Sequence, residues 1–409
     1  METGHDQVIA GLDIGSNNVT TVLGRKTPEG VEILGMGECS TEGMRKGAVV
    51  NVDATVKSIR RSVAEAERAT GLKVESAFVG ISGPLIKSFN SHAAVSVKNE
   101  KEVTDVDFKR VLDIARNVEL PNDREILHVL TQEFIVDDIA GIKNPLGMTG
   151  IRLDSRVHVV TNDIHGARNL MRCLEQAELD VESLVLSPLA SAYAALTAEE
   201  QEVGVALVDF GGGTVEMVIF YDGALRHAFV LPLGGGNITS DIAIGLKLPN
   251  ADAESLKISS GCAMIQKVRR DDLVELPGVG GRQPRPLRRQ HLSEIIEPRA
   301  EEIFALIQKE ILRSGYEDSL GAGIVLTGGG ALLEGLTDLG ERVFKMPVRR
   351  GGPIGINGRV EAVSRPACST AVGLVLYGSQ AFETVVDPHG GQPPEGIFNR
   401  IKKSLSDFF

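Results

Sequence analysis

One stretch constrains the fold more than any other: Val205–Phe220, which reads VALVDFGGGTVEMVIF. An apolar run ends at Asp209, a triple glycine and Thr214 follow, and a second apolar run leaves, which predicts a strand, a tight turn and a returning strand. Glycines lack a Cβ, so their backbone can approach a ligand, and successive N–H groups in such a turn form an anion site. An aspartate beside this site would repel a bare phosphate and therefore indicates a cation, expected to be Mg²⁺ held through waters. For a single copy, a plain β-hairpin with a glycine bulge is the alternative.

A second copy of the pattern lies near the N-terminus. Val8–Leu23 reads VIAGLDIGSNNVTTVL, in which Asp13 aligns with Asp209 and Gly15 with Gly211. Two similar hairpins far apart in the chain favour a duplicated fold in which two halves clamp one ligand.

Length, composition and charge set the class of protein. At 409 residues the chain is too long for one core, and 42% hydrophobic with 24% charged residues is typical of a soluble globular protein of two or more units. The formal net charge of −12 argues against nucleic acid as the main partner. Scattered cysteines, no signal-peptide pattern and no apolar run of the ~20 residues that a membrane span needs lead us to expect a cytoplasmic protein.

Strands and helices alternate along the chain, which predicts an α/β architecture. Asp53–Thr70 has the apolar stripe of an amphipathic helix, with Gly71 as its stop. From Gly83 to about Val160 the order changes to strand, helix, strand, strand, with Thr104 as the predicted helix N-cap. We expect this block to be a small α+β unit inserted into the first half.

The second half adds three glycine- or charge-rich features. Gly234–Gly236 is a packing turn or a third phosphate loop, and the lack of an adjacent Lys or Asp favours the packing turn. Gly323–Leu336 is predicted to form a strand, a glycine turn and a helix start, where a base or phosphate could lie. Pro277–Gln290 is predicted to be a loop, and its arginines in an acidic chain indicate a partner surface. Further helices are predicted over Asn162–Leu179, Pro188–Thr197, Ile238–Ile244, Ala251–Ser259, His291–Ser314 and Ser369–Phe382.

The C-terminal tail has the pattern of an interfacial membrane anchor. A linker, DPHGGQPPEG, precedes a helix with an apolar and a basic face, although a core helix docked on the body is the alternative. Each basic residue would add about 1 kcal/mol near anionic lipid. The expected membrane-binding residues are Ile397, Phe398, Arg400, Ile401, Lys402, Lys403, Leu405, Phe408 and Phe409.

The two hairpins and the late strand–Thr-Gly-Gly–helix element resemble the actin/Hsp70/sugar-kinase ATPase superfamily. Longer stretches resemble one family within it, the FtsA bacterial cell-division proteins, and GIKNPLGMTG and VGGRQPR are the most specific of them. The matching stretches, which with the terminal helix cover nearly the whole chain, are GLDIGSNNVTTVLG, GMRKGAVVNVD, LHVLTQEFIVDDIAGIKNPLGMTGIRL, LVDFGGGTVEM, VGGRQPRPLRRQHLSEIIEPR, GIVLTGGGALLEGL and STAVGLVLYG.

This resemblance implies an α/β, actin-like (ribonuclease H-like, duplicated) fold with an FtsA-type α+β insertion subdomain and a C-terminal amphipathic helix. The implied parts are subdomain 1A (residues 8–82, 162–203 and 362–384), subdomain 1C, the insertion (83–161), subdomain 2A (204–243 and 300–361), subdomain 2B (244–299), a linker (385–396) and the amphipathic helix (397–409).

The resemblance also implies bound ATP, with Mg²⁺ held through water near Asp13 and Asp209. Glu254 and Lys257 occupy the place of a superfamily pair against the ribose and adenine, which overrides their default interpretation as a solvated ion pair. The expected phosphate ligands are Asp13, Gly15, Ser16, Asn17, Asn18, Asp209, Gly211, Gly212, Gly213 and Thr214, and the expected adenosine ligands are Glu254, Lys257, Gly328, Gly329 and Gly330.

FtsA-like proteins polymerise head to tail, attach the tubulin-like protein FtsZ to the inner face of the cytoplasmic membrane and recruit later division proteins. The same partners are expected here, with no nucleic acid among them. The acidic FtsZ tail would bind subdomain 2B, where the complementary charges are Arg285, Arg288, Arg289 and Arg299.

One departure from the superfamily concerns hydrolysis. Members such as Hsp70 and MreB carry Glu-Pro at the start of the helix that links the halves, whereas this chain has Ser187–Pro188. Serine without a partner is no general base at neutral pH, so we expect an ATPase that is weak at most and a nucleotide used for assembly.

Other functions on the same fold remain open at this point. The runner-up within the fold is another FtsA-like ATPase, such as a pilus-assembly scaffold. A small-molecule kinase would need a further catalytic aspartate near a sugar pocket, and no extra Asp-bearing loop stands out. A chaperone would need a peptide-binding domain, and none is predicted.

Overall fold

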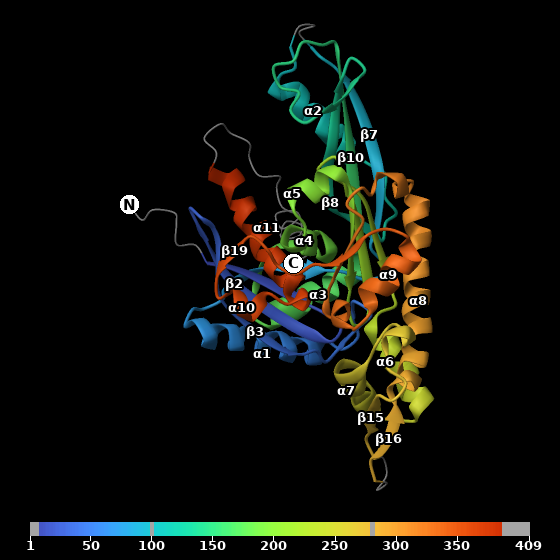
Figure 1. Ribbon diagram of the computed structural model, residues 1–409. Coiled ribbons are helices and arrows are strands. Elements are labelled where there is room, and N and C mark those ends of the chain that lie inside the picture. The colour runs from blue at the N-terminus through green and yellow to red at the C-terminus, as the bar shows by residue number, and fades with distance from the viewer. Residues whose placement is uncertain (1–7, 99–101, 279–282, 387–409) are drawn as a thin grey trace.

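The computed structural model describes residues 8–98, 102–278 and 283–386 (Figure 1). The predicted amphipathic helix, residues 397–409, and most of the predicted linker lie outside the described residues. Within the described part of the chain, no helix is both long enough and apolar enough to cross a membrane.

The first half is built on a sheet with the strand order β11-β6-β1-β2-β3-β19. β1, β2 and β3 form an antiparallel meander, and β6 runs parallel to β1. The strands are β1 (Val8–Ile14), β2 (Asn18–Thr27), β3 (Gly30–Ser40), β6 (Ser76–Ile81), β11 (Asp180–Leu186) and β19 (Ile356–Gly358), with a separate small hairpin of β4 (Met44–Arg45) and β5 (Ala48–Val49).

The second half repeats this plan in a sheet with the order β14-β13-β12-β17-β18. β12, β13 and β14 form the antiparallel meander, and β17 runs parallel to β12. The duplicated fold predicted from the two hairpins is therefore confirmed. The elements are β12 (Val205–Phe210), β13 (Val215–Tyr221), β14 (Ala224–Leu231), β17 (Ile324–Thr327), β18 (Val348–Arg350) and α9 (Leu336–Phe344).

Helices α4 (Ser187–Ala195) and α11 (Ser369–Val386) join the two halves. They pack on each other, α11 packs on β1, β2 and β6, and α4 packs on β12 and β13. The other helices of the two halves are α1 (Val52–Thr70), α3 (Ile164–Gln176), α5 (Ala198–Val203) and α10 (Val360–Val363).

The inserted unit projects from the body as a separate sheet with the order β7-β10-β8-β9 (Figure 1). Its helix α2 covers β7 and β10 over a small apolar core. Thr104 caps α2 in a capping box with Asp107, which confirms the predicted N-cap. The elements are β7 (Lys87–Ser96), α2 (Asp105–Arg116), β8 (Arg124–Val136), β9 (Ile139–Ile142) and β10 (Arg152–Asp163).

A small outer unit is formed by α6, α7, the β15–β16 hairpin and the start of α8. The structure corrects the predicted loop Pro277–Gln290 here, because Arg285–Arg288 pairs with Leu273–Leu276. Pro286 is tolerated in this hairpin because a two-stranded ribbon has a free edge for a residue without an N–H group. The elements are α6 (Gly235–Leu246), α7 (Asn250–Ser260), β15 (Leu273–Leu276), β16 (Arg285–Arg288) and α8 (Arg289–Ser314).

Capping residues define the helix ends, which the apolar pattern alone does not locate to the exact residue. The side chain of Asn51 accepts a hydrogen bond of 3.0 Å from the Ala54 amide at the start of α1, and Gly71 ends that helix with φ 76°. The predicted helix from Asn162 begins only at Ile164, because β10 continues through Asp163, whose side chain then caps α3.

Candidate functional site

The two glycine turns have the same internal geometry. In the first, the Gly15 amide donates to the carbonyl of Asn18 at 3.0 Å, and in the second the Gly211 amide donates to the carbonyl of Thr214 at 3.0 Å. Ile14 pairs with Val19 in the first hairpin, and Phe210 pairs with Val215 in the second, so the two turns have the same length after their aspartates. The predicted alignment of Asp13 with Asp209 is therefore confirmed by register.

The two turns face each other and touch. A Cβ placed on Gly212 would overlap the side chain of Asn17, and one placed on Gly213 would overlap that of Ser16. The sequence prediction that these residues converge is thus confirmed for Ser16, Asn17, Gly212 and Gly213. Asn18 differs, because its side-chain amide donates to Glu38 on β3 at 2.6 Å.

Three carboxylates lie beneath the turns. Asp209 and Glu216 are buried, and Asp13 is partly buried. Burial first, and then the charge of Asp209, raises the pKa of Asp13 to about 7. Burial is the main cause that raises the pKa of Glu216 to about 8, and the negative charges of Asp209 and Asp13 add to it. This concentration of negative charge in a low-dielectric site favours a bound cation.

Hydroxyl groups from several elements hold two of these carboxylates. Ser191 on α4 donates to Asp209 at 2.7 Å, and Thr370 on α11 donates to it at 3.4 Å. Burial raises the pKa of Asp209, and these two hydrogen bonds lower it in part. Glu216 accepts from Thr214 at 2.9 Å and from Ser82, which follows β6 in the first half.

Sequence reasoning missed Glu216 as a site residue. It lies directly across from Asp209 in the β12–β13 register, and its Oε2 atom is buried with no hydrogen-bond partner among the described residues. A usable signal was present, because Glu216 is the one charged residue in the otherwise apolar run Val215–Phe220. A charge inside a fully buried strand is costly unless it has a role.

The late glycine loop packs against the second turn. Gly328 has φ 81°, a conformation that favours glycine, and a Cβ there would overlap Asp209 Oδ1 and lie 2.8 Å from the carbonyl oxygen of Phe210. A Cβ on Gly330 would overlap the Phe210 ring, whereas Gly329 has more room. The structure therefore brings the predicted phosphate and adenosine loops together.

The Glu254–Lys257 pair is connected to the same turn. Lys257 Nζ donates to Glu254 at 2.6 Å and to the Gly235 carbonyl at 3.1 Å, while the Gly235 amide donates to the Gly211 carbonyl at 2.9 Å. The Lys257 side chain is only 12% exposed, so a solvated surface pair is excluded. Gly234–Gly236 packs on the phosphate turn, as predicted, and although no lysine adjoins it in the sequence, Lys257 reaches it from α7.

Ser187 and Asp13 approach the same glycine of β6. A Cβ placed on Gly80 of β6 would lie 3.0 Å from Ser187 Oγ and 3.6 Å from Asp13 Oδ1, so both groups meet at that glycine. The residue that differs from the superfamily pattern is therefore part of the site.

The four arginines predicted to bind a partner divide into two pairs. Arg285 and Arg288 on β16 are exposed, and no carboxylate partner is found for either among the described residues. Arg289 is bound to Glu334 and to the Ser260 carbonyl, and Arg299 is bound to Asp241 and Glu302. Arg299 and Asp241 also line a hollow of about 160 Å³ with Ile295, Pro298 and Glu302.

Comparisons with known proteins agree with this architecture. The model of the family described as cell division protein FtsA matches residues 206–373, and that of the SHS2 domain inserted in FtsA matches residues 83–161. The chain is 45% identical to cell division protein FtsA of Pseudomonas aeruginosa, covering 91% of this chain and 90% of that protein. It is 40% identical to FtsA of Escherichia coli strain K12, covering 92% and 91%, and 36% identical to FtsA of Neisseria meningitidis serogroup B, covering 98% of each.

Solved structures resemble the chain in fold alone. A PilM–PilN type IV pilus biogenesis complex matches with a TM-score of 0.65 at 16% identity, covering 91% of this chain and 98% of that one. MreB5 of Spiroplasma citri bound to ADP matches with a TM-score of 0.51 at 12% identity, covering 93% and 99%. The fold is therefore actin-like, and the sequence relationships show that the chain belongs to the FtsA family of cell-division proteins.

Proposed function

We propose that this protein binds ATP between its two halves and, in that state, assembles on the membrane to tether FtsZ at the division site. The observation that carries the nucleotide part is the pair of matching glycine turns that face each other over Asp13, Asp209 and Glu216. Backbone N–H groups in such turns bind anions, while the acidic floor requires a cation between it and the phosphates. A nucleotide with its metal supplies both charges.

Mg²⁺ fits the residues that are present. The orphaned, buried Oε2 atom of Glu216 and the raised pKa of Asp13 both favour a positive charge, and oxygen ligands with water are what Mg²⁺ prefers. When bound, the ion would neutralise phosphate charge against the carboxylates.

Calorimetric titration with ATP, with and without Mg²⁺, tests nucleotide binding. We expect Mg²⁺-dependent binding that Asp209→Asn weakens at least tenfold, about 1.4 kcal/mol. Asp113→Asn, on α2 in the insertion, is the matched control. An ATP affinity that changes neither on removal of Mg²⁺ nor with Asp209→Asn would refute the site.

Hydrolysis is expected to be slow because Ser187, which like Asp13 lies near Gly80, is no general base without a partner. Steady-state phosphate release measures turnover. Brisk release that survives Ser187→Ala would remove Ser187 as the explanation for slow hydrolysis.

Membrane attachment is proposed from the sequence of residues 397–409, with an apolar face for the acyl chains and Arg400, Lys402 and Lys403 for anionic headgroups. One such helix binds reversibly, so polymerisation into filaments would make attachment durable. Co-sedimentation with phosphatidylglycerol-containing vesicles, comparing the full chain with one that ends at Gly396, tests the anchor. A shortened chain that still sediments with vesicles alone would refute it.

FtsZ binding is proposed for the outer unit, on the inner face of the cytoplasmic membrane, with later division proteins joining the assembly. Arg285 and Arg288 are available to an acidic tail, whereas Arg289 and Arg299 would have to exchange a carboxylate partner. Fluorescence anisotropy with an FtsZ tail peptide should show weaker binding for Arg285→Glu and Arg299→Glu. A tail peptide that fails to bind the unsubstituted protein would favour the pilus-scaffold alternative.

A further inference from the structure

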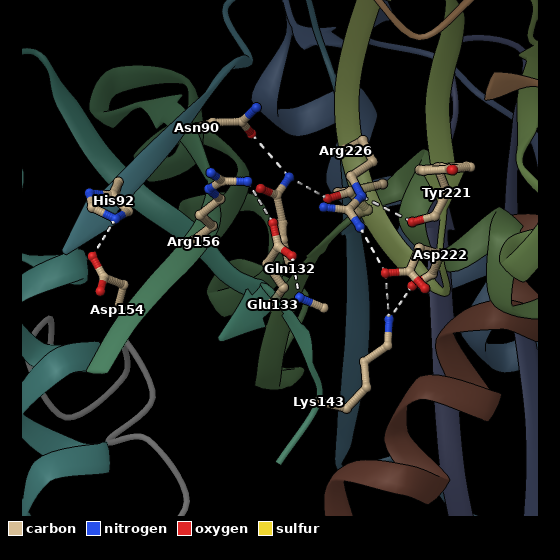
Figure 2. Close-up of polar contacts among 12 residues, drawn as sticks. Asn90, His92, Gln132, Glu133, Lys143, Asp154, Arg156, Tyr221, Asp222 and Arg226 are labelled. Atoms are coloured by element: carbon tan, nitrogen blue, oxygen red, sulfur yellow. Dashed lines mark hydrogen bonds and ion pairs between the residues drawn. The ribbon is translucent and has the colours of Figure 1, made fainter. Parts of the chain in front are cut away.

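The insertion belongs to the first half by connectivity, yet it is docked on the second half. It enters after Ser82 and returns through β10, while its strands β7, β8 and β10 contact β14 of the second sheet. Figure 2 shows the insertion side chain Lys143 directed at Asp222 of the second half, and Asn90 directed at Gln132 within the insertion. The insertion therefore spans both halves.

A buried and a partly buried hydrogen bond hold this contact. Gln132 is 4% exposed, and its amide nitrogen donates to the Leu225 carbonyl at 2.9 Å and to Asn90 Oδ1 at 3.1 Å. Ser88 donates to the Ala228 carbonyl at 2.9 Å. Because a buried carbonyl left without a donor is costly, separating these surfaces is unfavourable unless water can enter.

An ion pair closes the outer end of the contact. Lys143 Nζ lies 3.2 Å from Asp222 Oδ2 and also donates to the Asp222 carbonyl. Asp222 stands at the β13–β14 turn with φ 54°, and its amide donates to the Glu202 carbonyl at 3.0 Å, which fixes the turn. The pair is half exposed, so its own contribution is modest.

Strand β13 connects this ion pair to the glycine turn. Its first residues follow Thr214 and include Glu216, which accepts a hydrogen bond from Ser82, and Asp222 follows its last residue. The first half, including the insertion, thus contacts the second half at both ends of the same strand. Separating the two halves would break the Ser82–Glu216 hydrogen bond. The insertion would also have to leave β14 or move together with the second half.

We propose that the insertion is a strap that holds the two halves closed and limits the release of a bound nucleoside triphosphate. The proposal rests on the proposed ATP function. It follows that a ligand that pulls the insertion away from β14 speeds nucleotide exchange, and one that presses it onto β14 slows exchange.

Stopped-flow dissociation of a fluorescent ATP analogue from the full chain tests the strap. Lys143→Glu and Asp222→Lys should each speed dissociation about three- to tenfold, because a favourable pair is replaced by repulsion. The double reversal should recover part of the original rate. The recovery is partial because Arg226, 3.4 Å from Asp222 Oδ2, then faces a lysine and the Asp222 carbonyl loses its donor. Gln132→Ala should speed it at least as much. The control is Arg156→Ala, because Arg156 pairs with Glu133 at 2.7 Å within the insertion (Figure 2) and should leave the rate unchanged.

The outcomes are separable. If Gln132→Ala fails to fold, the half-exposed reversal pair still carries the test. If the unsubstituted protein binds the ATP analogue and every reversal variant releases it at the wild-type rate, the strap is overturned and the nucleotide function is not. No binding by the unsubstituted protein overturns the nucleotide function and the strap with it.

Discussion

Ser191 donates a hydrogen bond of 2.7 Å to Asp209, which links helix α4 to the strand that ends at the second glycine turn. Both residues are buried, and Thr370 of α11 lies 2.9 Å from the same hydroxyl. The aspartate that the sequence places in a hairpin is therefore held by the helices that join the two halves. Its ionisation depends on groups well away from it in the sequence.

Ser191→Ala should raise the pKa of Asp209 further and weaken Mg²⁺-ATP binding at neutral pH, because a donor that stabilises the carboxylate is lost. The stability cost should be about 1–3 kcal/mol, since the acceptor is buried. Ser62→Ala is a matched control: Ser62 is buried and bonded to Thr21 at 2.7 Å outside the site. Denaturant unfolding should show similar losses for both, while calorimetry should show weaker ATP binding only for Ser191→Ala.

The ligand-free protein should lose stability as pH rises from about 6.5 to 8. Below that range buried His128 and His158, whose pKa values are lowered to about 4 and about 3, add stability as pH rises and offset the carboxyls. Asp13 and Glu216 have folded-state pKa values of about 7 and about 8, above those of the unfolded chain. At a pH between the unfolded-state and folded-state pKa values of these carboxyls, the folded state binds more protons than the unfolded state. The stabilisation is therefore fully present below the unfolded-state pKa values and is lost as the carboxyls of the folded protein ionise. Melting temperatures measured in this range should fall by several degrees. Asp13→Asn should flatten the curve, and Mg²⁺-ATP should also flatten it. A melting temperature that rises over the same range would contradict the raised values.

Gly328→Ala should destabilise the protein by about 2–4 kcal/mol, because φ 81° is strained for alanine and the new Cβ would overlap Asp209. Gly315→Ala separates these effects, since Gly315 has φ 76° with no atom within 4 Å of the added Cβ. The control should cost only about 1 kcal/mol. Equal losses in urea unfolding would mean that the contact with Asp209 contributes nothing.

The parts of the fold that could be predicted are those set by local pattern. Alternating apolar runs around Asp13 and Asp209 predicted both hairpins, and their matching spacing predicted the duplication. The cap at Thr104 was equally local, because a capping side chain and its amide lie within one turn.

The parts that escaped prediction depend on contacts between distant elements. Ser191 and Thr370 reach Asp209 from helices whose patterns say only that they are buried. Lys257 reaches Gly235 because α6 and α7 pack together, a contact that sequence proximity to the glycines could not indicate. Strand β16 was missed because its proline and arginines lack the apolar alternation of a buried strand.

Lys257→Met should weaken ATP binding by acting on the second glycine turn as well as on the base. The Lys257 ammonium donates to Glu254, Thr239 and the Gly235 carbonyl. The amides of Gly235 and Gly236, on either side of that carbonyl, donate to the carbonyls of Gly211 and Gly212. Methionine keeps the length of the side chain but leaves the Glu254 carboxylate, which is 32% exposed, with only the Thr239 hydroxyl as a donor, at a cost of about 1–3 kcal/mol. We expect at least a tenfold loss of ATP affinity with a measurable fall in unfolding free energy.

A double-mutant cycle with Glu254→Gln distinguishes this linkage from simple loss of charge. If Lys257 acts through Glu254 and Gly235, the paired variant should bind ATP better than the sum of the single losses predicts, because the uncompensated carboxylate has been removed. Arg269→Met is the control in the same outer unit, since Arg269 is 76% exposed and its pair with Asp271 should contribute little to either measurement. Strict additivity, together with unchanged binding of inorganic triphosphate by Lys257→Met, would restrict this lysine to the adenosine and separate it from the phosphate turn.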